Sequence, residues 1–232
     1  MSAVANRTGD PGTFFEQNGY YLARGVFDEA MLLGLEQDFD RIVAQLLQSG
    51  ENVNARWKGG NVDSLDGGSS TVVHTHNVHR YSARWLRAFL DERFLEVTRR
   101  ILGPDIVLHH SKLFQKPPRE GAPFPVHQDW WYFPTKNDSM IAATIFVSDA
   151  DEEMGGFSVY PGSHRLGRVE QSSGLQSSAV LDRHPLENAT PVPARRGDVL
   201  FFSYFTLHGS PPNRSDRIRK TVLVQMHRGD DV

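Results

Sequence analysis

The densest group of chemically capable side chains lies at residues 125–132, where His127 and Asp129 stand two positions apart. In an extended strand, residues i and i+2 point to the same face, so this imidazole and this carboxylate would project side by side. One more histidine from a neighbouring strand would complete a set of two histidines and one carboxylate. Such a set leaves adjacent metal positions open, as a non-haem Fe(II) oxygenase requires. His127 and Asp129 are therefore candidate metal ligands.

His208 is the best candidate for the second histidine. It follows a Gly197-Asp198 turn and an apolar run at residues 199–202, which together predict a strand and its end. A basic cluster containing Arg217 and Arg219 comes next. A 2-oxo acid bound to the metal needs a cation at its far carboxylate, and the planar fork of arginine suits that role. Each feature alone also fits an ordinary strand, core or surface residue, so the interpretation depends on their combination.

The elements that must position these residues change in kind along the chain. Helical spacing of apolar residues predicts short and long helices at residues 13–18, 28–49 and 82–102, with a strand at 20–27 between the first two. Beyond Pro104, apolar runs punctuated by Gly and Pro predict strands near residues 106–114, 124–130, 140–147, 157–160, 198–203, 206–208 and 218–227. The sequence therefore predicts a mainly β fold, a jelly roll or related sandwich, with N-terminal helices.

We expect one domain over residues 1–232, with a flexible start at 1–12, helical support at 13–104 and the β core at 105–232. The Gly- and Ser-rich residues 50–70 are long for a simple connection, which favours a functional or disordered segment.

Composition excludes several classes of protein. The 25 Lys and Arg nearly balance the 28 Asp and Glu, which argues against a nucleic-acid-binding surface. The absence of cysteine excludes disulfide frameworks and thiolate catalysis, so a metal must be held by His, Asp or Glu. No run of about 20 apolar residues predicts a membrane span. The first residues lack the apolar core of a signal peptide, and we expect a cytoplasmic protein.

An ordered series of motifs resembles the phytanoyl-CoA dioxygenase family of Fe(II)/2-oxoglutarate-dependent oxygenases. The motifs are His127-Gln128-Asp129 with Tyr132-Phe133-Pro134, the acidic residues 149–153 before Gly155-Gly156, Tyr160-Pro161-Gly162-Ser163-His164, Gly197-Asp198, and the stretch from His208-Gly209-Ser210 to Arg219. The resemblance covers residues 106–227 well and implies a double-stranded β-helix, the jelly-roll core of cupin-like proteins. It also implies that His127, Asp129 and His208 bind Fe(II), with 2-oxoglutarate and O2 as cosubstrates.

The resemblance further implies four residues for the cosubstrate. Arg219 matches the arginine that binds its carboxylate, with Arg217 as the competing candidate, and Ser210 matches a hydroxyl that holds the same group. Gln128 and Lys112 match positions near the cosubstrate. The chain departs from the family at Met154 and Ile145, where relatives commonly have Asn and, in some cases, an aromatic residue. Relatives that halogenate lack the carboxylate ligand, so the presence of Asp129 favours oxygenation.

Substrate contacts are predicted less specifically. Continued strand alternation would place Trp131 on the ligands' side of the chain. His76, Asn77 and Arg80 belong to a polar cluster, and Trp57 lies in the long 50–70 segment. The alternative interpretations, core aromatics for the tryptophans and an exposed polar strand for the cluster, carry about equal weight. We expected His109, His110, His164 and His227 to be structural.

The expected function is hydroxylation of an unactivated C–H bond in a small or medium metabolite, an amino-acid-derived compound or a natural-product intermediate. Desaturation, cyclisation or epimerisation would use the same cofactors. A metal-free β-sandwich binding module, or a cupin-like metalloenzyme that does not use 2-oxoglutarate, are the alternatives outside this chemistry. We expect a small-molecule substrate, no nucleic-acid or membrane partner, and a monomer or homodimer.

Overall fold

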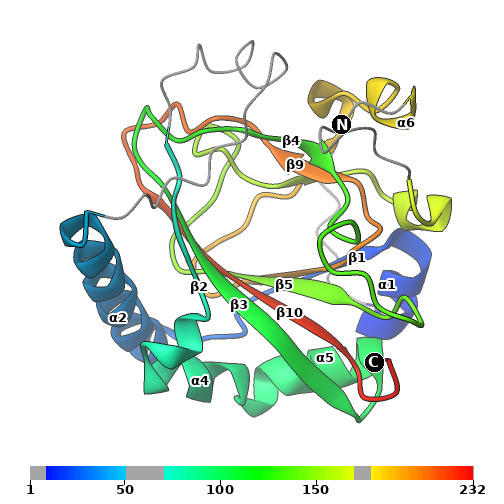
Figure 1. The fold of residues 1–232 in the computed structure, drawn as a ribbon, viewed down its shortest axis with the longest axis horizontal. Coiled ribbons are helices and arrows are strands. Elements are labelled where there is room, and N and C mark those ends of the chain that lie inside the picture. Colours follow the sequence, from blue (N-terminus) through cyan, green and yellow to red (C-terminus); the bar gives the residue numbers. More distant parts are fainter. Residues whose placement is uncertain (1–8, 51–70, 170–178, 232) are drawn as a thin grey trace.

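The computed structural model describes residues 9–50, 71–169 and 179–231, which form two facing antiparallel sheets with helices on one side (Figure 1). The six-stranded sheet has the order β1-β8-β5-β10-β3-β2, and the four-stranded sheet has the order β4-β9-β6-β7. This arrangement is the predicted jelly-roll core with N-terminal helices, and the predicted fold class is confirmed.

The large sheet combines strands from both halves of the chain. Its members are β1 (Tyr20–Ala23), β2 (Val73–His76), β3 (Ile106–Lys116), β5 (Ile141–Phe146), β8 (Val199–Ser203) and β10 (Arg219–Arg228). The two longest, β3 and β10, pair with each other in antiparallel register. Residues 13–104 are thus more than helical support, because they contribute both edge strands, β1 and β2.

The small sheet is made of short strands: β4 (Phe124–His127), β6 (Ser158–Val159), β7 (Thr190–Pro191) and β9 (His208–Ser210). Its register shifts between Phe124 and His127, where β4 pairs with β9. A Cβ on Gly209 would lie 2.8 Å from the carbonyl oxygen of Phe124, so the close approach at this irregularity requires glycine.

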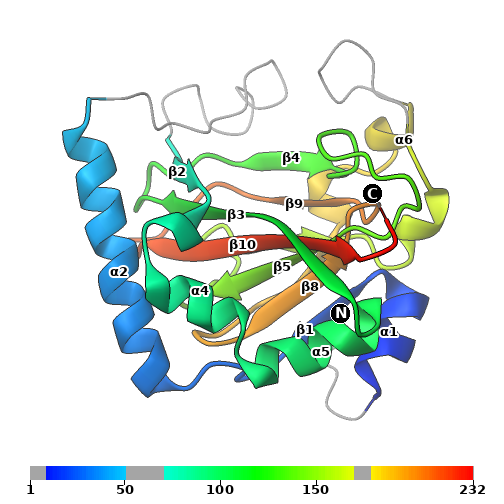
Figure 2. The ribbon, with the colours of Figure 1, turned by 60° about the horizontal axis from the view of Figure 1, so that its bottom comes forward.

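The short α6 (Ala179–Asp182) lies beside β4 and β9 of the small sheet (Figure 1), and 3-10 turns form at η1 (Val78–Arg80), η2 (Ser163–Leu166) and η3 (Leu186–Asn188). The other helices, α1 (Pro11–Asn18), α2 (Glu29–Gln48), α4 (Ala83–Phe89) and α5 (Glu92–Leu102), cover the outer face of the large sheet (Figure 2). Their apolar faces bury Phe39, Trp85 and Phe94 in one cluster with Phe201 and Val224 of the sheet. This packing leaves the inner face of the sheet free to line a site.

Two predicted elements differ from the structure. The single helix expected at residues 82–102 is broken at Leu90, because Asp91 accepts a hydrogen bond from the Arg93 N–H at 3.0 Å and starts a new helix. The strand expected at 124–130 ends at His127, where the chain enters a turn. The second difference matters for the site described below.

No helix within the described ranges is both long and apolar enough to cross a membrane.

Candidate metal centre

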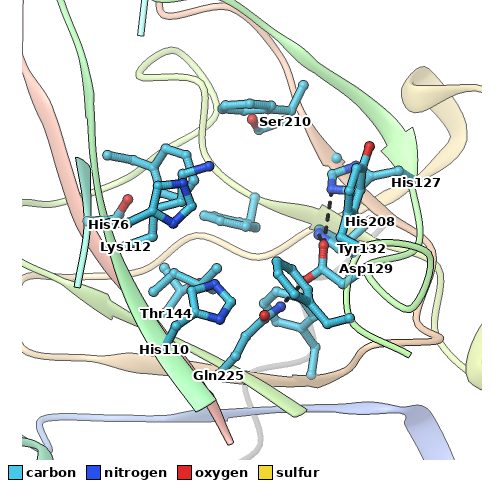
Figure 3. Close-up of a pocket in the computed structure, with 18 of the residues that line it drawn as sticks. His76, His110, Lys112, His127, Asp129, Tyr132, Thr144, His208, Ser210 and Gln225 are labelled. Carbon is cyan, nitrogen blue, oxygen red and sulfur yellow. Dashed lines mark hydrogen bonds and ion pairs between the residues drawn. The ribbon is translucent and has the colours of Figure 1, made fainter. Parts of the chain in front are cut away.

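His127, Asp129 and His208 meet at one point between the two sheets. His127 and His208 are direct partners across β4 and β9. The Nε2 atoms of His127 and His208 lie 3.5 and 3.8 Å from Oδ1 of Asp129, and one ligand atom from each residue fits within 4.8 Å of the others (Figure 3). All three residues are buried. Two imidazole nitrogens and a carboxylate oxygen form the donor set that suits Fe(II) with open coordination positions.

Backbone carbonyls orient both imidazoles. Nδ1–H of His127 donates to the Pro125 carbonyl oxygen at 2.8 Å, and Nδ1–H of His208 donates to that of Thr206 at 2.9 Å. A carbonyl oxygen only accepts, so each ring carries its proton on Nδ1 and presents the lone pair of Nε2 to the centre. Burial lowers the pKa of His208 to about 4, which keeps its ring neutral and able to bind a metal.

The carboxylate of Asp129 is held by Gln225, a residue that the sequence did not single out. The side-chain amide of Gln225 donates to Oδ2 of Asp129 at 2.9 Å, which leaves Oδ1 facing the histidines. Burial alone would raise the pKa of Asp129, but hydrogen bonding and the nearby histidines hold it below its ordinary value. Asp129 is therefore ionised before any metal binds.

Asp129 reaches the centre by a turn and not by strand alternation. Its N–H donates to the Tyr204 carbonyl oxygen at 2.9 Å, and the N–H groups of Tyr132 and Phe133 close hydrogen bonds back to Asp129 and Trp130. The predicted alternation beyond His127 is consequently wrong. Trp131 is exposed and does not line the cavity, whereas Tyr132, itself partly open to solvent, and Phe133 line the cavity next to the metal centre.

A cavity of about 510 Å³ extends from the metal centre between the sheets. Aromatic and aliphatic side chains form most of its wall: Phe114, Phe124, Tyr132, Phe133, Phe157, Phe202 and Leu223. Polar atoms of Thr144, Thr221, Gln225 and Arg219 are buried in this wall without a hydrogen-bond partner among the described residues. Such orphaned groups indicate a polar ligand, because an unsatisfied buried polar group is costly.

One end of the cavity carries Arg219, whose Nε is among these orphaned atoms. Its guanidinium donates to the Gly155 carbonyl oxygen and lies 5.3 Å from the centre of the Phe157 ring. Burial lowers its pKa to about 9, and Arg219 forms no ion pair with an acid in the part of the chain that the structure describes. A buried cation of this kind fits the far carboxylate of 2-oxoglutarate. Arg217, the competing candidate, is half-exposed and pairs with Asp151 at 2.5 Å, away from the cavity.

Ser210 lies beside Arg219 in the cavity, and a residue that the sequence analysis missed positions its hydroxyl. Lys116 is fully buried and donates to Ser210 Oγ and to the Pro211 carbonyl oxygen, each at 2.7 Å. Lys116 is also the cross-strand partner of Arg219. While Lys116 is protonated its Nζ only donates, so the Ser210 hydroxyl then keeps its own proton for an acceptor in the cavity. A lysine at an inward position of an apolar strand was the available signal.

Gln128 is not among the residues that line the cavity, and its predicted role near the cosubstrate stays a prediction. Its amide donates to the carbonyl oxygens of Gly167 and Phe205 at 2.9 and 2.6 Å, and its Oε1 accepts from the Val169 N–H at 3.0 Å. These three hydrogen bonds join the turn after His127 to neighbouring loops. Lys112, by contrast, lines the cavity, and its predicted place near the cosubstrate stays a prediction.

Only some of the predicted substrate residues line the cavity. His76 lines the cavity. Asn77 has a left-handed backbone (φ 56°) before η1, and Arg80 is exposed; neither lines the cavity. Trp57 lies outside the described residues. His110 lines the cavity, although we expected it to be structural, whereas His164 hydrogen-bonds the Glu16 carbonyl oxygen at 3.0 Å outside it.

Lys116→Met is expected to raise the KM for 2-oxoglutarate about 5- to 30-fold, the effect of losing one hydrogen bond to a charged group. Michaelis curves in 2-oxoglutarate measure this, with the exposed Lys136→Met as the matched control. Ser210→Ala should show a similar rise, and the double variant should show little more, because both changes remove one interaction. Additive losses in the double variant would disprove the coupling of Lys116 to Ser210.

Solved structures share the fold of this chain over most of its length. The epimerase SnoN, solved with Fe3+, alpha ketoglutarate and nogalamycin RO, superposes with a TM-score of 0.78 at 20% identity, covering 95% of this chain and 83% of its own. EctD from S. alaskensis, solved with 2-oxoglutarate and 5-hydroxyectoine, gives a TM-score of 0.74 at 19% identity over 97% and 80%. The fold and the His-Asp-His centre together define a non-haem iron, 2-oxoglutarate-dependent oxygenase.

Sequence comparison then gives the family. Residues 15–221 match the family model "Phytanoyl-CoA dioxygenase (PhyH)", and the chain belongs to this family.

Individual relatives share 24% to 33% of their residues with this chain over the aligned parts. A probable alpha-ketoglutarate-dependent hypophosphite dioxygenase of Stutzerimonas stutzeri is 33% identical over 57% of this chain and 49% of its own length. The ectoine dioxygenase of Bordetella parapertussis is 25% identical over 90% and 72%, and the peroxisomal phytanoyl-CoA dioxygenase of Bos taurus is 24% identical over 90% and 65%. The chain thus spans about half to three quarters of these relatives' lengths.

Proposed function

We propose that the chain, working as one oxygenase domain, hydroxylates an unactivated C–H bond of a small or medium metabolite, such as an amino-acid-derived compound or a natural-product intermediate. The observation that carries the proposal is the presence, in one cavity, of three metal donors and an unpaired buried arginine. Fe(II), bound by His127, Asp129 and His208, would supply the activation of O2 that organic side chains cannot provide.

Other side chains of the cavity bind the cosubstrate, orient a metal ligand and exclude water. Arg219 and Ser210 bind the far carboxylate of 2-oxoglutarate, with Lys116 holding the serine in place. Gln225 keeps one oxygen of Asp129 directed at the metal. The aromatic wall excludes bulk water from the reacting groups, which strengthens each of these polar interactions.

The test begins without a substrate. Anaerobic addition of Fe(II) and 2-oxoglutarate to the wild-type protein is expected to produce a visible charge-transfer band, as for a keto acid chelated to ferrous iron. A metabolite library read out by O2-dependent succinate release then identifies compounds that are turned over. Absence of the band in the folded wild-type protein would disprove the use of 2-oxoglutarate.

Product mass separates hydroxylation from the related reactions. Hydroxylation adds one oxygen atom, desaturation and oxidative cyclisation remove two hydrogen atoms, and epimerisation leaves the mass unchanged. The alternatives remain worth testing because structures of similar fold include the carbocyclase SnoK, with a TM-score of 0.77 at 21% identity, as well as the epimerase SnoN.

A further inference from the structure

Residues 129–140, the 129–140 loop, begin and end at contacts with the same residue, Tyr204. The N–H of Asp129 donates to the Tyr204 carbonyl oxygen at 2.9 Å, and the N–H of Tyr204 donates to the Met140 carbonyl oxygen at 3.2 Å. Compact loops with closed ends of this kind frequently carry function. The loop contains no helix or strand, so its shape between these ends depends on contacts with other parts of the chain.

Two aromatic residues of the 129–140 loop belong to the cavity wall. Tyr132 lines the cavity beside the metal centre (Figure 3), and Phe133 lines it with its ring centre 4.5 Å from that of His110. Tyr132 is 46% exposed, so it stands where the cavity meets solvent. The position of the loop therefore sets the shape of this part of the wall.

A buried carboxylate, that of Asp231, holds the second half of the loop. Its Oδ2 accepts hydrogen bonds from the Thr135 hydroxyl at 2.7 Å and from the N–H and the hydroxyl of Ser139 at 2.8 and 2.6 Å. Its Oδ1 accepts from the Asn137 N–H at 2.5 Å. Because Asp231 follows β10, these hydrogen bonds tie the loop to the end of a strand that lines the cavity.

The charge of Asp231 strengthens this contact. Burial alone would raise the pKa of Asp231, but the hydrogen bonds from Ser139, Asn137 and Thr135 hold that pKa well below its ordinary value. The carboxylate is therefore ionised at neutral pH and only accepts. Hydrogen bonds to an ionised acceptor are about twice as strong as those between neutral groups, so the loop depends strongly on this one side chain.

The candidate metal ligand at the start of the loop is held by other groups. The Tyr204 carbonyl oxygen binds the N–H of Asp129, and the Gln225 amide binds its carboxylate. Further along, Asp138 accepts from the Tyr204 hydroxyl and pairs with Arg168 at 2.6 Å, but that ion pair is partly exposed and contributes little. Loss of the Asp231 contacts would therefore release the wall residues while Asp129 stays in place.

We propose that Asp231 is a positioning residue for substrate binding, whose carboxylate fixes the 129–140 loop so that Tyr132 and Phe133 form the cavity wall before a substrate arrives. The inference deepens the proposed function and rests on it for the nature of the ligand. A loop that must become ordered on binding weakens the apparent affinity in proportion to the fraction of molecules in which it is already in place. A loop fixed in advance avoids this loss.

Asp231→Asn tests the role with a change that preserves the shape of the side chain. Whichever way the new amide turns, its NH2 group faces the N–H of Asn137 or that of Ser139, so at least one loop donor loses its acceptor. Hydrogen exchange of the anaerobic protein loaded with Fe(II) and 2-oxoglutarate is read by mass spectrometry. Exchange in the 129–140 loop is expected to accelerate at least about 10-fold, as for the loss of one hydrogen bond to a charged group, and to stay unchanged elsewhere.

Substrate kinetics separate a positioning role from a purely structural one. The substrate is the library compound that gives the largest succinate release. Asp231→Asn should raise its KM about 10-fold with kcat nearly unchanged, as expected when the loop is in place in roughly one free molecule in ten. Saturating substrate should restore slow exchange in the loop of the variant. Fe(II) affinity and the titration of the charge-transfer band with 2-oxoglutarate should stay as in wild type, because Asp129 is held separately.

Two further variants complete the experiment. Asp230→Asn, at the neighbouring exposed carboxylate that pairs with Arg228 at 3.0 Å, is the matched control and should behave as wild type throughout. Thr135→Val removes one donor from the other side of the contact. It should shift loop exchange and KM in the same direction by a smaller factor, and it decides by the same criteria if Asp231→Asn does not fold.

Three results would overturn the role of Asp231: loop exchange equal to that of wild type, faster loop exchange with KM unchanged, or loss of the charge-transfer band in Asp231→Asn. The first would show that the contact does not fix the loop, and the second that it serves the fold alone. The third would assign Asp231 to the metal site. Failure of the wild type to form the band would instead overturn the proposed function, while faster exchange confined to the loop would still support its positioning by Asp231.

Discussion

Replacement of His208 by alanine is expected to lower both Fe(II) affinity and O2-dependent succinate release by more than about 100-fold. Loss of a residue that only orients a metal ligand typically costs up to that factor, and His208 contributes a ligand atom itself. The Nε2 atom of His208 and the facing Nε2 of His127 provide two of the three donors, so one imidazole and one carboxylate would remain. His127 and Asp129, both from the end of β4 and the turn after it, form a much weaker site.

Anaerobic equilibrium dialysis with Fe(II) measures the affinity, and succinate formation measures the turnover. The matched control is His164→Ala, which removes a partly buried imidazole that binds the Glu16 carbonyl oxygen outside the cavity. Thermal unfolding of both variants separates metal loss from misfolding. If His208→Ala retained stoichiometric Fe(II) binding at wild-type affinity, His208 would not be a ligand.

Arg219→Met is expected to raise the dissociation constant for 2-oxoglutarate about 10- to 100-fold with Fe(II) affinity unchanged. Hydrogen bonds to charged groups contribute about 1.5–3 kcal/mol each, and tenfold in affinity corresponds to about 1.4 kcal/mol. The same variant should not lower the free energy of unfolding by more than about 1 kcal/mol in the absence of 2-oxoglutarate. The reason is that Arg219 is buried beside Lys116 without an acid, so its removal also relieves an unpaired charge.

Titration of the charge-transfer band with 2-oxoglutarate measures the affinity, and urea unfolding measures the stability. Arg217→Met, two residues away, is the control, because Arg217 forms a half-exposed ion pair with Asp151 of the kind that contributes little. A larger effect of Arg217→Met than of Arg219→Met on 2-oxoglutarate affinity would reverse the assignment.

The sequence was sufficient to predict that His127, Asp129 and His208 cluster, because their spacing and order carry the information, and their binding of iron stays a prediction. His127 and Asp129 are two residues apart, and strand signals surround both them and His208, so few arrangements of the chain could bring together a better donor set. The predicted route of Asp129 to the metal was nevertheless wrong. The hydrogen bonds of residues 129 and 130 to the Tyr204 carbonyl oxygen, 75 positions from Asp129 in sequence, form a turn that local alternation does not anticipate.

The same turn decides which of the aromatic residues Trp131 and Tyr132 lines the cavity. Trp131 is exposed and Tyr132 enters the cavity, the reverse of a continued strand. Gln128 was predicted to lie near the cosubstrate from its resemblance to a family residue, but its partners in the structure, Gly167, Phe205 and Val169, come from loops that fold over it. Neither outcome could be predicted without knowing which distant backbone groups lie near this turn.

The sequence by itself determined the class of fold and was sufficient to predict the three candidate metal donors and an arginine as the anion-binding group, because residue type, period and order along the chain suffice for these. Only the tertiary structure decided that Arg219 and not Arg217 faces inward, and that Lys116 and Gln225 hold Ser210 and Asp129. These features depend on the pairing register of β10 with β3 and on contacts across about 95 residues of chain. A shift of register by one residue would turn the same side chains to the opposite face, so their roles are properties of the folded sheet.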